Sequence, residues 1–276
     1  MPHIGWKCLK GAFVTVVALG FGFLILPLLV IIPLSFNVEP YFTFTEGMLR
    51  FDGDAYSLRW YRSIVENPEW RAAIGNSFFI GIFAAALATV LGTLAAMGLN
   101  HPKFPFREFV SAFVISPMVT PVIIVAVGVF FFYSAIGLGQ TRLGLILAHA
   151  MLGAPFVVIT VSATLAGFDH TLLRAAASLG AGPITAFRRI QLPIIAPGVF
   201  TGALFAFAAS FDEVVIVLFL GGVDQRTIPR QMWSGIREEI SPTILAIATL
   251  LIAFAILVLL AVELLQKSGK RIHEDT

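Results

Sequence analysis

The chain has 276 residues, of which 58% are hydrophobic and only 12% are charged. A soluble domain of this length needs more polar surface to face water, so the composition excludes an ordinary soluble protein. The net charge of +2 is too small to indicate a nucleic-acid partner. Cys8 is the single cysteine, which excludes an intrachain disulfide. The composition therefore indicates a protein that lies in membrane lipid.

Apolar runs of about 18 residues or more recur along the chain, and each can cross a hydrocarbon core of about 30 Å as a helix. Backbone groups in lipid must bond internally, and the alternating pattern of a membrane barrel is absent, so helices are expected. We therefore predict an all-α polytopic membrane protein, with one transmembrane domain over residues 1–276. Its six predicted spans are residues 12–36, 73–99, 109–133, 143–167, 197–221 and 242–265.

The first predicted span follows Lys7 and Lys10, as the apolar part of a signal peptide does. Its apolar run continues to Phe36, which is too long for a signal peptide, so we interpret it as a retained span. An even number of spans places both termini on one side of the membrane. With both termini cytoplasmic, the inner segments hold ten of the eighteen basic residues and every lysine. The positive-inside rule then favours this orientation.

The outer segment, residues 37–72, is partly acidic and carries Trp60, Tyr61 and Trp70. Residues 57–65 have the pattern of a short amphipathic helix at the membrane interface, where aromatic side chains act as anchors. A surface that receives a partner protein is the alternative, and the interfacial anchor is favoured over it.

The third and fourth spans contain Pro117, Pro121 and Pro155, which can bend these helices and free backbone groups for neighbouring partners. His149 lies inside the fourth span. It has no other metal-ligand residues around it in the sequence, so we expect a packed histidine with one hydrogen-bond partner rather than a ligand or a proton relay.

The segment between the fourth and fifth spans is polar and basic, in contrast to the apolar runs on either side. Asp169 is a suitable residue to cap a helix and Gly180 to end it in a left-handed conformation. Pro183 is placed to begin a second short helix. We predict a helix–turn–helix outside the bilayer, with one helical face formed by Leu172, Leu173, Ala176 and Leu179.

Two carboxylates, Asp212 and Glu213, stand inside the predicted fifth span. Charges at such depth are costly and usually face a cavity or a partner charge. Neighbouring residues on a helix point about 100° apart, so one is expected to face a substrate pathway while the other pairs with an adjacent helix. Packing between subunits, or an outer gate, is the equally weighted alternative.

Motifs of several enzyme classes are missing from the sequence. It has no GxxxxGK[ST] phosphate loop, so we do not expect it to hydrolyse ATP. It also has no HExxH, GxSxG or paired cysteines, so we expect neither a catalytic residue nor a metal site. A membrane-embedded enzyme is therefore disfavoured, while a self-contained secondary carrier or a channel remains the alternative to a subunit of a larger transporter.

The segment 168–198 resembles the EAA loop of ABC-importer permeases. The matching residues are Ala175, Ala176, Gly180, Ile190, Leu192 and Pro193, whereas Arg174 stands where the family has glutamate. In that family the loop carries the coupling helix, which docks in a groove of a cytoplasmic ATPase. The resemblance therefore implies a cytoplasmic loop whose coupling residues are Arg174, Ala175, Ala176, Gly180, Ala181, Pro183 and Pro193.

Longer strings, such as SLRWYRSIVENPEWRAAIGNSFFIGIF and SFDEVVIVLFLGG, resemble the spermidine/putrescine branch of these permeases. The resemblance implies a type I ABC-importer permease fold in a bacterial inner membrane. Its implied partners are a second permease subunit, an ATPase dimer that binds ATP and Mg, and a periplasmic solute-binding protein. The implied substrate is a polyamine; another small amine, an amino-acid-derived solute and a metal cation remain alternatives.

Overall fold

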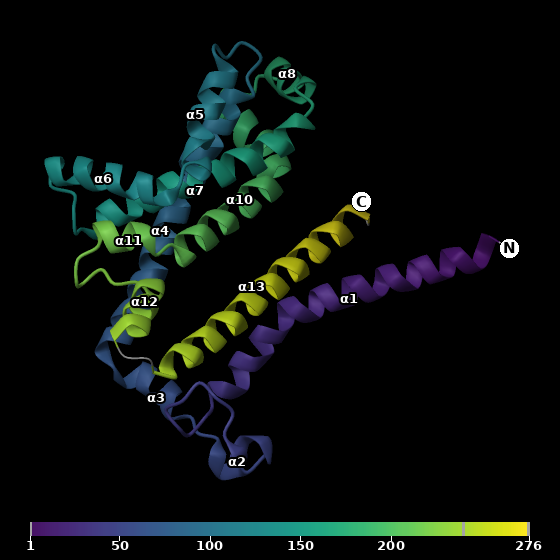
Figure 1. Cartoon of the computed structure of the whole chain (residues 1–276). Helices are drawn as coiled ribbons and strands as arrows, with labels where there is room; N and C mark the ends of the chain where they lie inside the picture. The colour runs from purple at the N-terminus through teal and green to yellow at the C-terminus, as the bar shows by residue number, and fades with distance from the viewer. Residues whose placement is uncertain (1, 239–240, 275–276) are drawn as a thin grey trace. The chain divides into compact units, whose positions relative to one another are not determined.

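The computed structural model describes residues 2–238 and 241–274, which form helices joined by short connections (Figure 1). Within those two ranges the only strand-like pairing is a single bridge between Asn37 and Tyr56. Among the described residues, five helices are long and apolar enough to cross a membrane, and one bent pair of helices makes a sixth candidate. The predicted all-α, polytopic fold is therefore confirmed.

The residues group into two units, of which the first is formed by the described parts of 1–68 and 234–276. Val30 and Leu34 at the end of its first helix pack with Leu245 at the start of its last helix. In the most apolar stretch of the first helix no residue is buried within the chain, as suits a surface that faces lipid. The elements of this unit are α1 (Pro2–Leu34), α2 (Glu46–Leu49), a 3₁₀ turn (Gly53–Ala55), α3 (Arg59–Glu66) and α13 (Thr243–Glu274).

The segment that follows α1 in this unit is folded around Asn37, which is fully buried. The Asn37 side-chain amide donates to the carbonyls of Tyr41 and Thr43, at 3.2 and 3.1 Å. The Trp60 ring N–H donates to the Asn37 carbonyl at 2.7 Å. The helix expected over residues 57–65 is present as α3, but Trp60 also ties this segment together, which an interfacial anchor alone does not require.

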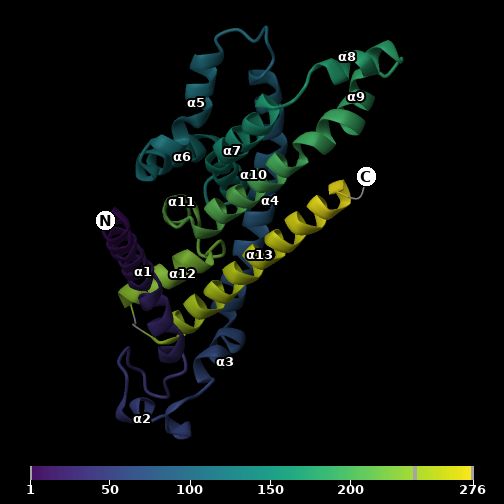
Figure 2. The ribbon, with the colours of Figure 1, turned by 90° about the vertical axis from the view of Figure 1, so that its right-hand side faces the viewer.

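The second unit runs from Glu69 to Trp233. Figure 2 shows α8 and α9 at one end of α10, with α11 at the other end. The elements are α4 (Pro68–Leu99), α5 (Arg107–Val119), α6 (Val122–Ile136), α7 (Arg142–Ala166), α8 (Thr171–Ser178), α9 (Pro183–Ala186), a π-helical segment (Phe187–Gln191), α10 (Leu192–Asp212), α11 (Val215–Leu220) and the start of α12 (Ile228–Glu238).

The core of the second unit is formed where α4, α7 and α10 pack together through small residues. Buried alanines and valines fill it, since small side chains let helix backbones approach closely. A Cβ atom added to Gly92 of α4 lies only 2.7 Å from Val157 of α7, so glycine is needed at this crossing. The buried members are Ala84, Ala85, Ala88, Ala96, Ala150, Val157, Val161, Leu165, Phe168, Ile195 and Ala206.

The predicted third span, 109–133, is broken in the structure into α5 and α6, which meet at an angle of 102°. Thr120 between them is extended, with ψ of 136°, because the following Pro121 disfavours the helical conformation of the residue before it. Pro117 and Pro155 lie inside α5 and α7 without ending them. The expectation that proline bends this span is thus confirmed at Pro121.

Candidate functional site

The first helix of the segment between α7 and α10 is held at its start by Asp169. Its carboxylate accepts hydrogen bonds from the Thr171 backbone N–H at 2.8 Å and from the Thr171 hydroxyl at 2.6 Å. These two donors, the hydroxyl foremost, lower the pKa of Asp169 below its usual value. The N-cap residue is His170, so Asp169 stands one position before the predicted cap, but its carboxylate still satisfies a free N–H group at the start of the helix. The carboxylate stays ionised at neutral pH.

The end of α8 has the Schellman geometry, in which a left-handed residue turns the chain back on the last helical turn. Gly180 has a φ of +82°, and its N–H donates to the Ala177 carbonyl at 3.0 Å. The N–H of Ala181 reaches back to the Ala176 carbonyl, also at 3.0 Å. The prediction that Gly180 ends this helix in a left-handed conformation is confirmed.

The outer surface of this segment presents apolar and basic side chains together. Leu179 is 88% exposed and Ile184 is 74% exposed. Arg174, Arg188 and Arg189 are exposed as well. Of the predicted helical face, Ala176 is buried and Leu173 is half-buried, whereas Leu172 and Leu179 are exposed, and Leu179 follows the last residue of α8. Exposed leucine and isoleucine beside arginines are typical of a surface that a protein partner covers.

The inner surface of the same segment packs on the core of α4, α7 and α10. Leu173 of α8, Ile190 of the π-helical segment and Leu192 of α10 all contact that core. Ala176 and Ala186 are buried beneath the two short helices. Packed side chains therefore connect this segment to α4, α7 and α10.

The coupling residues expected from the sequence occupy distinct places in this segment. Ala175 and Arg174 are exposed on α8, and Ala181 follows the left-handed turn. Pro183 opens α9, where its missing N–H costs no helical hydrogen bond. Pro193 lies in the first turn of α10. The structure thus groups all of them between the ends of α7 and α10.

The carboxylates of the predicted fifth span lie at a break between two helices. α10 ends at Asp212, whereas the predicted span continued to residue 221. Glu213 is extended, and its carboxylate accepts hydrogen bonds from the N–H groups of Val215 at 2.7 Å and Ile216 at 3.0 Å. Glu213 therefore caps the start of α11. Asp212 is exposed, and no hydrogen bond or ion pair engages its side chain within the described residues.

His149 of α7 fixes the end of α10 two residues before Asp212. Its side chain is 1% exposed, and its Nδ1 lies 2.7 Å from the Ser210 hydroxyl and 3.2 Å from the Ser210 carbonyl oxygen. The expectation of a packed histidine with one hydrogen-bond partner is confirmed. Because the bond joins two helices, it holds the residues around the break in place.

The family model described as the inner membrane component of binding-protein-dependent transport systems matches residues 88–271. The chain belongs to this family. The permease is therefore the membrane-spanning subunit of an ABC importer and lies in the inner membrane as a multi-pass protein. The predictions of a transport subunit, of its family and of a non-enzymatic role are confirmed.

Curated relatives align with the permease over almost its full length. It is 31% identical over 261 residues to the spermidine/putrescine transport system permease protein PotC of Haemophilus influenzae, covering 95% of this chain and 97% of that protein. It is also 31% identical over 270 residues to the putrescine transport system permease protein PotI of Escherichia coli strain K12, covering 95% and 93%.

A solved structure has the same fold. A chain of a bacterial alginate ABC transporter, in complex with an alginate pentasaccharide-bound periplasmic protein, matches with a TM-score of 0.69. The match covers 93% of the permease and 92% of that chain at 16% sequence identity. The predicted ABC-importer permease fold is therefore confirmed.

Two features of the permease were missed by the sequence patterns. The helix break at Glu213 has no proline or glycine to signal it, and the apolar run continues beyond it. The contact of Arg142 with Phe79, at 5.5 Å from the guanidinium carbon to the ring centroid, joins residues far apart in the chain. One signal in the sequence could have drawn attention to Arg142. It follows Thr141 directly at the start of an apolar run, where the helix dipole disfavours a cation.

Gly180→Val is expected to uncouple ATP hydrolysis from transport while the subunit still reaches the membrane. No atom lies within 4 Å of a Cβ added at Gly180, so the cost comes from its φ of +82° alone, about 1–2 kcal/mol for a side chain. Gly182→Val is the matched control, because Gly182 has an ordinary extended conformation and equally open surroundings. Substrate-stimulated ATPase activity and uptake measure the effect. Equal activity of the two variants contradicts the assigned turn.

Proposed function

We propose that the permease imports a polyamine, spermidine or putrescine, across the bacterial inner membrane. The observation that carries this proposal is the similarity to PotC and PotI over 95% of the chain. The unpaired carboxylate of Asp212 at a helix break supports it, because an ammonium group gains a charge-assisted hydrogen bond from such a partner. The substrate is taken over from a solute-binding protein in the periplasm.

The partners in this proposal are a second permease subunit, an ATPase dimer and the periplasmic binding protein. ATP and Mg are bound by the ATPase, not by this chain. The segment from α8 to the start of α10 docks on the ATPase, with Leu179 and Ile184 entering its groove and Arg174 facing one of its acids. The exposure of these apolar side chains and the packing of the segment's inner face on the core support this role.

In the proposed orientation both termini and this docking segment are cytoplasmic. Lys103 and Arg107, exposed between α4 and α5, lie on the same side. In this orientation α7 runs inwards from Arg142, and α10 runs outwards to Asp212. The hydrogen bond between Ser210 and His149 places the end of α10 beside the first half of α7, so Asp212 lies towards the outer end of α7. A carboxylate there meets the cation early on its way inwards.

The mechanism follows from how the second unit is packed. ATP-driven closure of the ATPase moves α8 and α9, and the shared core carries the motion into α7 and α10. The break at Asp212 and Glu213 then shifts relative to its surroundings, which opens or closes the cation's path. Such a two-state movement of packed helices requires no chemistry in this chain.

Reconstitution tests the substrate directly. The complete transporter in proteoliposomes, with its binding protein and internal ATP, is expected to accumulate labelled spermidine or putrescine. Amino-acid-derived solutes and divalent metal cations serve as competitors. Uptake of one of these other solutes, with no uptake of a polyamine, contradicts the polyamine assignment while leaving the permease role intact.

Arg174→Glu is expected to weaken assembly with the ATPase, because like charges replace the proposed attraction. A drop of about tenfold in affinity corresponds to about 1.4 kcal/mol, within the usual range for such pairs. Reversal of the ATPase acid is expected to restore assembly. Lys103→Glu, an exposed cation of the neighbouring connection, is the matched control. If the Arg174→Glu variant assembles with the ATPase and transports substrate as well as the parent does, the proposed charge pair is excluded.

A further inference from the structure

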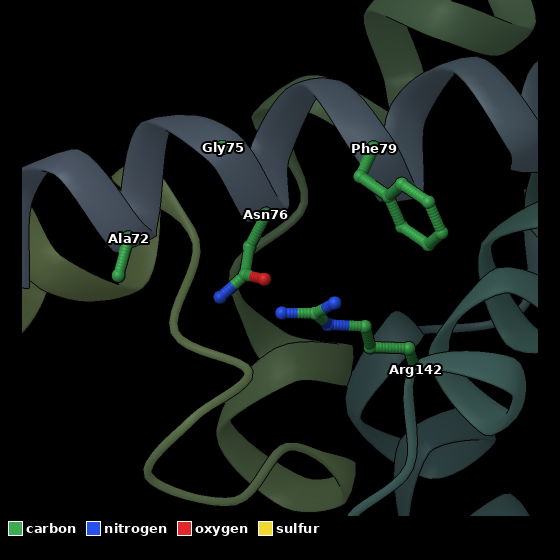
Figure 3. A pocket seen from close by; sticks show the side chains of 5 residues that line it. All are labelled: Ala72, Gly75, Asn76, Phe79 and Arg142. Atoms are coloured by element: carbon green, nitrogen blue, oxygen red, sulfur yellow. The ribbon is translucent and has the colours of Figure 1, made fainter.

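A small pocket lies where the first turns of α4 approach the start of α7 (Figure 3). Its volume is about 290 Å³. One wall is the polar amide of Asn76, and the other walls are the Phe79 ring and the Arg142 side chain. Ala72 and Gly75 contribute no bulk, so the pocket stays open to solvent on that side. The pocket therefore combines a cation, an amide and an aromatic ring.

Asn76 is held in a fixed orientation. The residue is 3% exposed, and its side-chain nitrogen donates to the Asp224 carbonyl at 2.7 Å and to the Arg226 carbonyl at 3.0 Å. Both amide hydrogens are thus used by the segment that precedes α12. The amide oxygen is left as an acceptor, and Figure 3 shows the Arg142 guanidinium pointing towards Asn76.

Arg142 carries a positive charge that is not neutralised within the described residues. Its guanidinium carbon lies 5.5 Å from the centroid of the Phe79 ring, and no ion pair joins it to an acid. It is also the first residue of α7, a helix capped by Thr141, where the helix dipole adds further positive potential. An arginine in this position gains free energy when an anion binds beside it.

We infer that this pocket receives a carboxylate side chain of the periplasmic binding protein when that protein docks. The inference rests on the proposed function and orientation. α7 has 25 residues, which is about 37 Å of helix, and it separates the pocket from the docking segment of the ATPase. The pocket therefore opens on the periplasmic side. A polyamine is repelled from it by Arg142, so the pocket is not part of the cation's path.

The surroundings of the pocket favour a protein carboxylate over an anionic lipid headgroup. Glu69 lies one turn before Ala72 on α4, 3.8 Å from Arg226 and 3.1 Å from the Gln231 side-chain nitrogen, and the carbonyl of Asp224 accepts from Asn76. Acids therefore alternate with cations beside the pocket, so a surface of uniform negative charge meets repulsion as well as attraction. A protein surface of mixed charge accommodates them, because it can place one carboxylate at Arg142 and avoid the rest.

The test uses the complete transporter in nanodiscs and its own spermidine-loaded binding protein. Arg142→Gln is expected to weaken the affinity of the transporter for the binding protein about tenfold. It is also expected to make this affinity less dependent on salt concentration, because a charge-assisted pair is lost. Arg142→Lys keeps the charge and is expected to retain most of the affinity. Arg71→Gln is the matched control, because Arg71 is exposed near the start of α4 but does not line the pocket. Basal ATPase activity is expected to stay at the parental level in Arg71→Gln.

Three results overturn the inference. One is equal affinity of the parent and Arg142→Gln, and another is an equal loss in Arg71→Gln. The third is a difference in affinity for the binding protein, between the parent and Arg142→Gln, that appears only in nanodiscs with anionic lipid. That result assigns the pocket to a lipid headgroup. If the parent transporter itself binds no binding protein, the proposed function fails, and this outcome is distinct from the other three.

Discussion

Replacing Asp212 with asparagine is expected to reduce polyamine uptake by about tenfold or more, while assembly and basal ATPase activity persist. The substitution keeps the shape of the side chain and removes its charge. Asp212 is exposed at the end of α10 and has no partner within the described residues, so its charge is available to the cation in the proposed mechanism. In a partly dehydrated path, an attraction of about 1–4 kcal/mol between unit charges is realistic, and 1.4 kcal/mol is a factor of ten.

Glu213→Gln is the matched comparison. Glutamine retains an oxygen that can accept from the N–H groups of Val215 and Ile216, so the cap of α11 is weakened rather than lost. We expect this variant to lower complex yield and thermal stability modestly and to keep most of the uptake. Asp224→Asn, an exposed acid outside α10, controls for general surface charge. If the Asp212→Asn variant takes up polyamine at the parental rate, the chemistry of this residue no longer supports a cationic substrate.

Gly202→Ala is expected to have the largest effect on folding. A Cβ atom added at Gly202 lies 2.5 Å from the Thr160 hydroxyl and 2.8 Å from the Val157 Cα. A backbone atom cannot rotate away, so α7 and α10 must separate. Overpacking of this kind costs about 1–3 kcal/mol, which is a large share of a marginal stability. We expect low complex yield and a lower midpoint of thermal unfolding in detergent.

Gly128→Ala is the control for this experiment. Gly128 is also a helical glycine, and a Cβ atom added there meets nothing within 4 Å. Alanine is the better helix former, so the control is expected to be neutral or slightly stabilising. Equal unfolding midpoints for the two variants contradict the close crossing of α7 and α10.

Local signals in the sequence were sufficient to locate the long apolar helices, though not the breaks in the third and fifth predicted spans, and to place the turn at Gly180. Long apolar runs and a glycine after a helical pattern act over a few residues, so they can be recognised without the fold. Pro121 was recognised as a possible bend, but the angle of 102° depends on how α6 packs on α11 and could not be predicted.

The helix break at Glu213 shows why the composition of a segment does not always predict where a helix ends. Val214 to Leu220 is as apolar as the preceding helix, so the pattern predicts one continuous span. The break exists because the Glu213 carboxylate bonds to the N–H groups of α11 and the chain is extended at this residue. The pocket of Asn76 and Arg142 was equally hidden, because only the packing of α4 beside α7 brings these distant residues together.

The helical stretch from Pro183 to Asp212 has a geometric consequence for transport. It spans 30 residues without a gap, and Gly198 and Gly202 hold it closely against α7. At 1.5 Å per residue its length is about 45 Å, so a tilt of about 10° at the ATPase end carries Asp212 sideways by about 8 Å. In the proposed mechanism, a rotation of about 10° at the docking segment therefore gives a lateral shift that approaches the width of a helix. The position of Asp212 then reports on the angle of that rotation.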